Sequence, residues 1–147
     1  MEIIAKNLKE TEKIAVDFVK KILKAPTKKE ATVVLLEGEL GAGKTAFTKA
    51  MAKTLGISEV VRSPTFIIQK TYRLENKKYN QLIHIDAYRF EEGREAKILE
   101  LENLFKNPRN LIVIEWSQNI PSIIKAGSRH IDFIFVDESK RKIKIHD

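Results

Sequence analysis

The chain has 147 residues with a net charge of +7 at pH 7, and it contains no cysteine. This length suits one domain, residues 1–147, and the missing cysteines exclude both a disulfide framework and a thiolate metal site. We expect a cytoplasmic protein, because the N-terminus has no signal-peptide pattern and no apolar run is long enough to cross a bilayer. The positive charge favours an anionic partner such as a nucleotide, RNA or an acidic protein face, although lysines on solvated faces would give the same total.

The N-terminal part of the chain predicts a short strand and then an amphipathic helix. Residues 2–6 have strand character, and Asn7 with Glu10 forms a capping-box pattern at a helix start. Apolar residues recur at helical spacing from there, which predicts a helix over 8–24. After a loop, residues 32–37 are apolar and β-branched without alternation, the pattern of a strand buried on both faces.

A glycine-rich loop comes next, and a helix and two strands follow it. The loop, residues 38–45, reads GELGAGKT, and we call it the glycine loop. Helical spacing then continues to Leu55, and Gly56 suits the C′ position. The strand-like segments 66–74 and 79–85 are joined by ENKK, which predicts an antiparallel hairpin.

The C-terminal part predicts one more helix, one more buried strand and a closing hairpin. Residues 93–105 place apolar side chains on one helical face. Residues 111–116, LIVIEW, have the pattern of a second buried parallel strand. The segments 130–136 and 142–146 alternate on either side of the turn DESK, which predicts the final hairpin.

The glycine loop matches G-x-x-x-x-G-K-[ST], the phosphate-binding pattern of P-loop NTPases. Gly41 and Gly43 let successive backbone N–H groups point inward at an anion, and the following helix adds its positive N-terminal end. In this pattern Lys44 reaches the β- and γ-phosphates and the Thr45 hydroxyl ligates Mg²⁺. The alternative is a glycine-rich turn without a ligand. We therefore expect an α/β fold of the P-loop NTPase type: a mixed sheet with flanking helices, an antiparallel hairpin inserted after the P-loop helix, and a C-terminal hairpin.

A P-loop site also needs an acidic residue at the end of a buried strand, to hold Mg²⁺ directly or through water. Asp86 ends the run QLIHID and Glu115 ends NLIVIE, so both are candidates for the carboxyl edge of the sheet, where nucleotides bind. Either alone could be a structural carboxylate that caps a helix or pairs with Arg89. The presence of both predicts at least one catalytic acid.

The segment SPTF, residues 63–66, lies between the P-loop helix and the predicted hairpin. Pro64 stiffens it, and Ser63 and Thr65 offer hydroxyl groups. It is either a switch that senses the γ-phosphate or a plain Ser-Pro turn that starts a strand.

The histidines and the tryptophan give weaker signals. His84 lies two residues before Asp86, so both side chains face the same way on a strand, and His84 either orients that acid or is an ordinary core histidine. Trp116 is a core residue or a contact for a nucleotide or a partner. His130 and His146 support no prediction, and the histidines show no metal-ligand spacing.

Taken in chain order, these motifs resemble the TsaE family, formerly called YjeE. These are small bacterial P-loop ATPases required for making threonylcarbamoyladenosine on tRNA. The resemblance covers nearly the whole chain, and the matching residues are Asn7, Glu10 and Thr11; Gly38 to Thr45; Val61 to Phe66; His84, Asp86, Tyr88 and Arg89; and Glu115 with Trp116. The chain departs from the usual family residues at Glu39, Ala87, Ser117 and Gln118.

The resemblance implies site residues by matching position. It implies catalytic roles for Lys44, Asp86 and Glu115, with Thr45 and Glu115 holding Mg²⁺. Asp86 would serve the hydrolytic water or the outer metal shell. The implied ATP-binding residues are Thr11 near the base, Glu39, Leu40, Gly41, Ala42, Gly43, Lys44 and Thr45 around the phosphates, Ser63 and Thr65 on a nucleotide-responsive loop, and Arg129.

The resemblance also implies a function. The protein would bind and hydrolyse ATP with Mg²⁺, as an accessory to the bacterial complex that makes threonylcarbamoyladenosine on tRNA. The partner proteins TsaD and TsaB would catalyse the transfer, and the ATPase would reset their complex between turnovers. Contact with tRNA would be indirect, through that complex, and neither DNA nor a membrane is expected as a partner.

Two other functions compete with this one. In a small-molecule or nucleotide kinase, Asp86 would act as a base toward a substrate hydroxyl. Such kinases usually carry an arginine-rich lid, whereas residues 91–110 contain only Arg94 and Arg109. A non-enzymatic RNA-binding protein would use the positive charge, but the chain lacks an aromatic stacking platform and this reading leaves the glycine loop unexplained.

Overall fold

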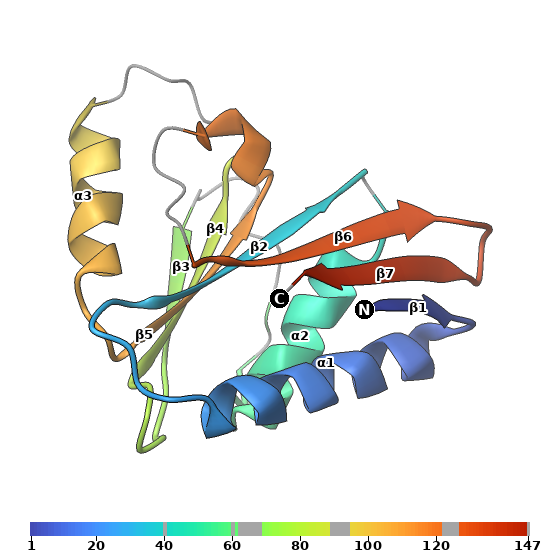
Figure 1. The fold of residues 1–147 in the computed structure, drawn as a ribbon, viewed down its shortest axis with the longest axis horizontal. Coiled ribbons are helices and arrows are strands. Elements are labelled where there is room, and N and C mark those ends of the chain that lie inside the picture. Colours follow the sequence, from blue (N-terminus) through green and yellow to red (C-terminus); the bar gives the residue numbers. More distant parts are fainter. Residues whose placement is uncertain (40, 60, 62–68, 89–94, 122–126, 147) are drawn as a thin grey trace.

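The computed structural model describes residues 1–39, 41–59, 61, 69–88, 95–121 and 127–146. Within them the strands form a seven-stranded sheet in the order β1-β7-β6-β2-β5-β4-β3. The strands are β1 (Glu2–Ala5), β2 (Thr32–Gly38), β3 (Gln69–Arg73), β4 (Gln81–Asp86), β5 (Asn110–Glu115), β6 (Arg129–Phe135) and β7 (Arg141–His146). The helices are α1 (Leu8–Lys24), α2 (Lys44–Thr54) and α3 (Glu95–Phe105), with a short 3-10 helix η1 (Ser117–Asn119). The predicted α/β class is confirmed (Figure 1).

Parallel strands form the centre of the sheet and antiparallel strands form its edges, so the sheet is mixed, as predicted. β2 pairs parallel with β5 and with β6, and β4 pairs parallel with β5. β3 pairs antiparallel with β4, and β7 pairs antiparallel with β6 and with β1. The central place of β2 and β5 explains why their sequences are apolar without alternation, since both faces of each strand are covered.

Helices cover the two faces of the sheet, and the sheet divides the core into two clusters (Figure 1). α1 and α2 pack on one face, which we call the α1/α2 face, and α3 packs on the other, the α3 face. Successive residues of β5 alternate between them: Leu111 and Val113 face α1 and α2, whereas Ile112 and Ile114 face α3. This alternation decides which polar side chains at the strand ends can meet.

The start of α1 follows from its first residues. The Asn7 side chain accepts a hydrogen bond from the Glu10 N–H at 2.9 Å, and the Glu10 carboxylate accepts one from the Lys6 N–H at 2.6 Å. This confirms the predicted capping box, with Glu10 reaching one residue further back than in the usual arrangement. The helix ends at Lys24 because Ala25, which precedes Pro26, adopts an extended conformation.

The two strands after α2 differ modestly from their predicted bounds of 66–74 and 79–85. β3 ends one residue earlier than predicted, at Arg73, and its predicted residues 66–68 lie outside the described part of the chain. β4 begins two residues later than predicted and ends one residue later, at Asp86. Tyr79 precedes β4, and its hydroxyl shares a hydrogen bond of 2.7 Å with the Thr32 hydroxyl in the core. Tyr79 therefore fastens the turn before β4 to the start of β2.

The remaining elements agree with the predicted pattern. α2 ends at Thr54, and Gly56 follows with a left-handed φ of 89°. β6 and β7 each begin one residue earlier than predicted, and the predicted helix residues 93 and 94 lie outside the described chain. Among the described helices, none has the length and apolar character needed to cross a membrane.

Candidate functional site

The glycine loop leads directly from the end of β2 into the start of α2. At Gly38 an added Cβ would lie 2.5 Å from the backbone oxygen of Phe133, so the close approach of β6 leaves no room for a side chain. Gly43 forms the N-cap of α2 with a left-handed φ of 106°, a conformation that favours glycine. The first N–H groups of α2 have no partner within the helix, so this end of the helix suits an anion.

Lys44 is a buried cation at the first position of α2. The residue is only 5% exposed, and its ammonium donates to the backbone oxygens of Gly38 and Glu39. It also lies 4.3 Å from the centre of the Trp116 ring. Burial lowers the pKa of Lys44, while the negative charges of Glu115 and Asp86 oppose that shift. An anionic ligand here would replace neutral partners of the lysine with charged ones.

Asp86 and Glu115 lie side by side at the carboxyl ends of β4 and β5. They are register partners in this parallel pair, and both are almost fully buried. Their neighbours Leu82 and Val113, two or four residues earlier on the same strands, pack on the α1/α2 face, so the two carboxylates leave the sheet toward α2. Both acids therefore lie at the carboxyl edge of the sheet, as predicted.

His84 contacts Glu115, not Asp86. Its Nε2 lies 2.6 Å from Glu115 Oε2, and the histidine is completely buried. The idea that His84 orients Asp86 is wrong, because the register of β4 against β5 carries the ring across to the neighbouring strand. Asp86 instead accepts a hydrogen bond from the Tyr88 N–H at 2.9 Å. Each acid therefore has its own positioning contact.

Trp116 turns the chain sharply where β5 ends. Its φ of 60° is left-handed, and no other non-glycine residue of the described chain has a positive φ. The indole ring packs 4.9 Å from the Tyr88 ring, centre to centre, as well as beside Lys44. Asn119 donates from its side chain to the backbone oxygens of Ala87 and Tyr88, which ties the ends of β4 and β5 together. A strained backbone held in this way is typical of functional sites.

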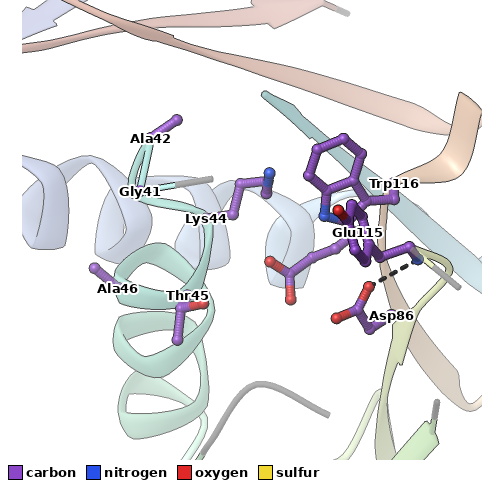
Figure 2. Close-up of a pocket in the computed structure, with 10 residues that line it drawn as sticks. Gly41, Ala42, Lys44, Thr45, Ala46, Asp86, Glu115 and Trp116 are labelled. Carbon is purple, nitrogen blue, oxygen red and sulfur yellow. Dashed lines mark hydrogen bonds between the residues drawn. The ribbon is translucent and has the colours of Figure 1, made fainter. Parts of the chain in front are cut away.

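These groups enclose a cavity of about 350 Å³, which we call the main cavity. Figure 2 shows Lys44 and Thr45 on the side of α2, and Asp86, Glu115 and Trp116 on the side of the strand ends. The lining residues are Gly41, Ala42, Gly43, Lys44, Thr45, Ala46, Asp86, Tyr88, Glu115 and Trp116. A cation, a free helix end, a hydroxyl and two carboxylates thus face one space.

A second cavity of about 380 Å³ borders the other side of the glycine loop. The two cavities share Gly41, Gly43 and Ala46, and the second is completed by residues from α1 and the β6–β7 turn: Asn7, Leu8, Thr11, Glu138, Ser139 and Arg141. The Arg141 guanidinium donates to the Gly41 backbone oxygen at 3.1 and 3.3 Å. The second cavity therefore brings the predicted Thr11 beside the loop and adds Arg141, which no sequence signal indicated.

The remaining predicted site residues line neither cavity or lie outside the described part of the chain. Glu39 is exposed at the loop, and Leu40, Ser63 and Thr65 lie outside the described residues. Arg129 pairs with Val34, four residues before Gly38 in the chain, and lines neither cavity. The structure therefore does not bring Arg129 to the glycine loop, because it stands at the start of β6 and not at its carboxyl end.

Comparisons with known proteins agree on one family. The model described as "Threonylcarbamoyl adenosine biosynthesis protein TsaE" matches residues 5–143. The "tRNA threonylcarbamoyladenosine biosynthesis protein TsaE" of Aquifex aeolicus (strain VF5) is 31% identical over 147 residues, which cover 99% of this chain and 95% of that protein. The protein of the same name from Bacillus subtilis (strain 168) is 43% identical over 98 residues, 67% of this chain and only 58% of that relative.

A solved structure shares the fold. "Crystal structure of Bacillus subtilus YdiB" superposes with a TM-score of 0.75 at 29% identity, and the match covers 99% of this chain and 83% of that one. The family model, the Aquifex aeolicus relative and this structure all span the glycine loop and the strands behind it, and the chain belongs to the TsaE family.

Proposed function

We propose that the protein binds ATP with Mg²⁺ and hydrolyses it, as an accessory of the machinery that makes threonylcarbamoyladenosine on tRNA. One observation carries the proposal: Lys44, Thr45, Asp86 and Glu115 come from three separate elements and line the same cavity. The pathway comes from the printed names of the relatives, which are biosynthesis proteins for this tRNA modification.

The main cavity suits the phosphates. A polyphosphate needs a fixed cation and several N–H donors, and Lys44 with the start of α2 offers both. Among the described residues, Lys44 has only neutral oxygens as hydrogen-bond acceptors, so phosphate oxygens would be stronger partners. The second cavity, beside Thr11, would take the nucleoside end of ATP.

The oxygen groups beside Lys44 suit Mg²⁺. Hard divalent cations prefer hydroxyl and carboxylate oxygens, and Thr45 and Glu115 both line the main cavity. We assign these two residues to the metal, with the His84 ring holding one Glu115 oxygen and leaving the other available. When bound, Mg²⁺ neutralises charge on the phosphates.

Asp86 would act on the water that attacks the γ-phosphate. Its carboxylate lines the main cavity, and one oxygen is fixed by the Tyr88 N–H, so the carboxylate has a defined orientation. A positioned carboxylate can accept a hydrogen bond from a water molecule and aim its lone pair. Trp116 and Tyr88 would shield this side of the cavity from bulk solvent.

We further propose that TsaD and TsaB are the partners and that ATP hydrolysis resets their complex between turnovers. The test is ATP hydrolysis by the protein alone, with TsaD and TsaB from the same organism, and with small-molecule hydroxyl acceptors. We expect Mg²⁺-dependent release of inorganic phosphate that rises when TsaD and TsaB are added. Phosphate transfer to an acceptor without release of inorganic phosphate would contradict the proposal and indicate a kinase.

A further inference from the structure

A cluster of possible metal ligands lies on the α3 face of the sheet, on the opposite face from Glu115 and Asp86. Glu37 near the end of β2 is the register partner of Asp132 on β6, and His130 on β6 is the register partner of Leu35. Leu35 belongs to the core cluster of the α3 face, so the three polar side chains project from that face. We call Glu37, His130 and Asp132 the sheet cluster.

The ligand atoms of the sheet cluster are as close together as those around a bound ion. His130 Nε2 lies 3.0 Å from Glu37 Oε2 and 3.2 Å from Asp132 Oδ1. The three ligand atoms all lie within 4.8 Å of one another. Nitrogen and oxygen ligands held about 2.0–2.2 Å from a tetrahedral Zn²⁺ are separated from each other by about 3.3–3.5 Å.

These short distances are not ordinary hydrogen bonds. His130 Nε2 is shielded from solvent, and within the described chain it has no partner with hydrogen-bond geometry, although two carboxylate oxygens are close. Atoms that form a hydrogen bond point at each other, whereas ligands of one ion point at a common centre and only approach each other. His130 Nε2 is close to both carboxylate oxygens without hydrogen-bond geometry, which a shared ion would explain.

The other oxygen of each carboxylate is held in place by a neighbour. Ser117 donates its hydroxyl to Glu37 Oε1 at 2.7 Å, and His146 Nε2 donates to Asp132 Oδ2 at 2.9 Å. Each carboxylate therefore has one oxygen fixed by a neighbour and the other beside His130. Outer contacts of this kind orient the ligands of metal sites.

We propose that the sheet cluster binds one divalent transition-metal ion of the Zn²⁺ class, through His130 Nε2, Glu37 Oε2 and Asp132 Oδ1, with water completing the coordination. An imidazole ligand selects such ions over Mg²⁺, which prefers oxygen ligands alone. The ligand side chains are 28–36% exposed, so the cluster borders solvent although the Nε2 atom itself is covered. Glu37 directly precedes Gly38, the first residue of the glycine loop, and its partner Ser117 directly follows Trp116. The bound ion would therefore stabilise the chain where the glycine loop begins.

The test is Zn²⁺ affinity, measured by competition with a chromophoric chelator in the presence of excess Mg²⁺. The Glu115→Gln variant is used throughout, because it removes the acid of the main cavity that we assign to a metal. We expect one Zn²⁺ per chain and a loss of affinity of at least about 100-fold in His130→Ala. Ser117→Ala should lose about 10–100-fold, the usual effect of removing an outer contact. Co²⁺ should give a visible absorption band that His130→Ala abolishes.

Glu2→Gln is the matched control. Glu2 and Asp132 are both register partners of Lys144, so they project from the same face, and Glu2 pairs with Lys142 and Lys144 outside the cluster. Its Zn²⁺ affinity should equal that of the parent. Asp132→Asn serves as a second variant if His130→Ala unfolds, and thermal unfolding without metal identifies that case. The competing explanation is a protonated His130 shared by two carboxylates. The proposal would be overturned if the Glu115→Gln background protein bound Zn²⁺ no more tightly than the same protein carrying His130→Ala or Asp132→Asn.

Discussion

Lys44 is a buried cation, and its charge is less favourable in the ligand-free protein than in water. Burial lowers its pKa from 10.5, against the opposing influence of Glu115 and Asp86. Between the lowered folded pKa and 10.5, the unfolded chain holds the proton that the folded protein has released. Through this residue, the free energy of unfolding of the ligand-free protein therefore rises with pH across that window.

The same shift predicts a proton uptake when ATP binds. The phosphates favour the charged lysine, so at alkaline pH, within the window below 10.5, binding must reprotonate Lys44 and affinity must fall as pH rises. Calorimetric titration in buffers of different ionisation enthalpy measures the protons taken up. Lys44→Met is the control and should lose the part of the uptake due to the lysine. Equal proton uptake by both proteins would show that Lys44 does not titrate with binding.

The two acids should separate by role when each is replaced by its amide. Gln at 115 can still accept a hydrogen bond from His84, so Glu115→Gln should keep the core intact while weakening Mg²⁺-dependent ATP binding. Asp86→Asn keeps the oxygen that accepts from the Tyr88 N–H, so ATP binding should stay near normal while the hydrolysis rate falls by about 10²–10⁴. The two roles are distinguished by measuring the ATP affinity of both variants with and without Mg²⁺, together with their hydrolysis rates. The reverse pattern would make Asp86 the metal-holding acid.

At the scale of helices and strands, local patterns were enough to predict the elements that frame the cavity. The capping residues and helical spacing gave α1 its observed bounds, because those interactions lie within a few residues of one another. The unbroken apolar runs of β2 and β5 predicted central strands for the same reason. The runs QLIHID and NLIVIE likewise mark Asp86 and Glu115 as strand-end acids, and the structure makes them register partners.

Contacts between distant elements could not be predicted from such patterns. Arg141 reaches Gly41 across 100 residues of sequence because β7 returns beside β6, and no motif marks that approach. The partner of His84 depends on the register of β4 against β5, which alternation alone does not give. The sheet cluster was also missed, although His130 and Asp132 are two residues apart on a strand, a spacing that places both on one face.

At the scale of the whole molecule, the sheet separates the two proposed sites. The main cavity opens at the carboxyl edge on the α1/α2 face, and the sheet cluster lies on the α3 face. Lys78 donates to the Ile22 backbone oxygen near the end of α1, where burial and the neighbouring Arg129 and Lys28 lower its pKa. Arg129 thus belongs to a different part of the surface from the glycine loop.

The central claim is that the main cavity binds ATP through Lys44 and the glycine loop. Calorimetric titration of ATP with Mg²⁺ into the parent, Lys44→Ala and the control Lys53→Ala tests it most directly. Lys53 lies exposed in the last turn of α2, so its replacement changes the charge of the same helix equally. We expect Lys53→Ala to bind like the parent and Lys44→Ala to lose about 10–100-fold in affinity, the effect of one charged hydrogen-bonding group. Lys44→Ala that stays folded by circular dichroism and binds ATP as tightly as the parent would contradict the account.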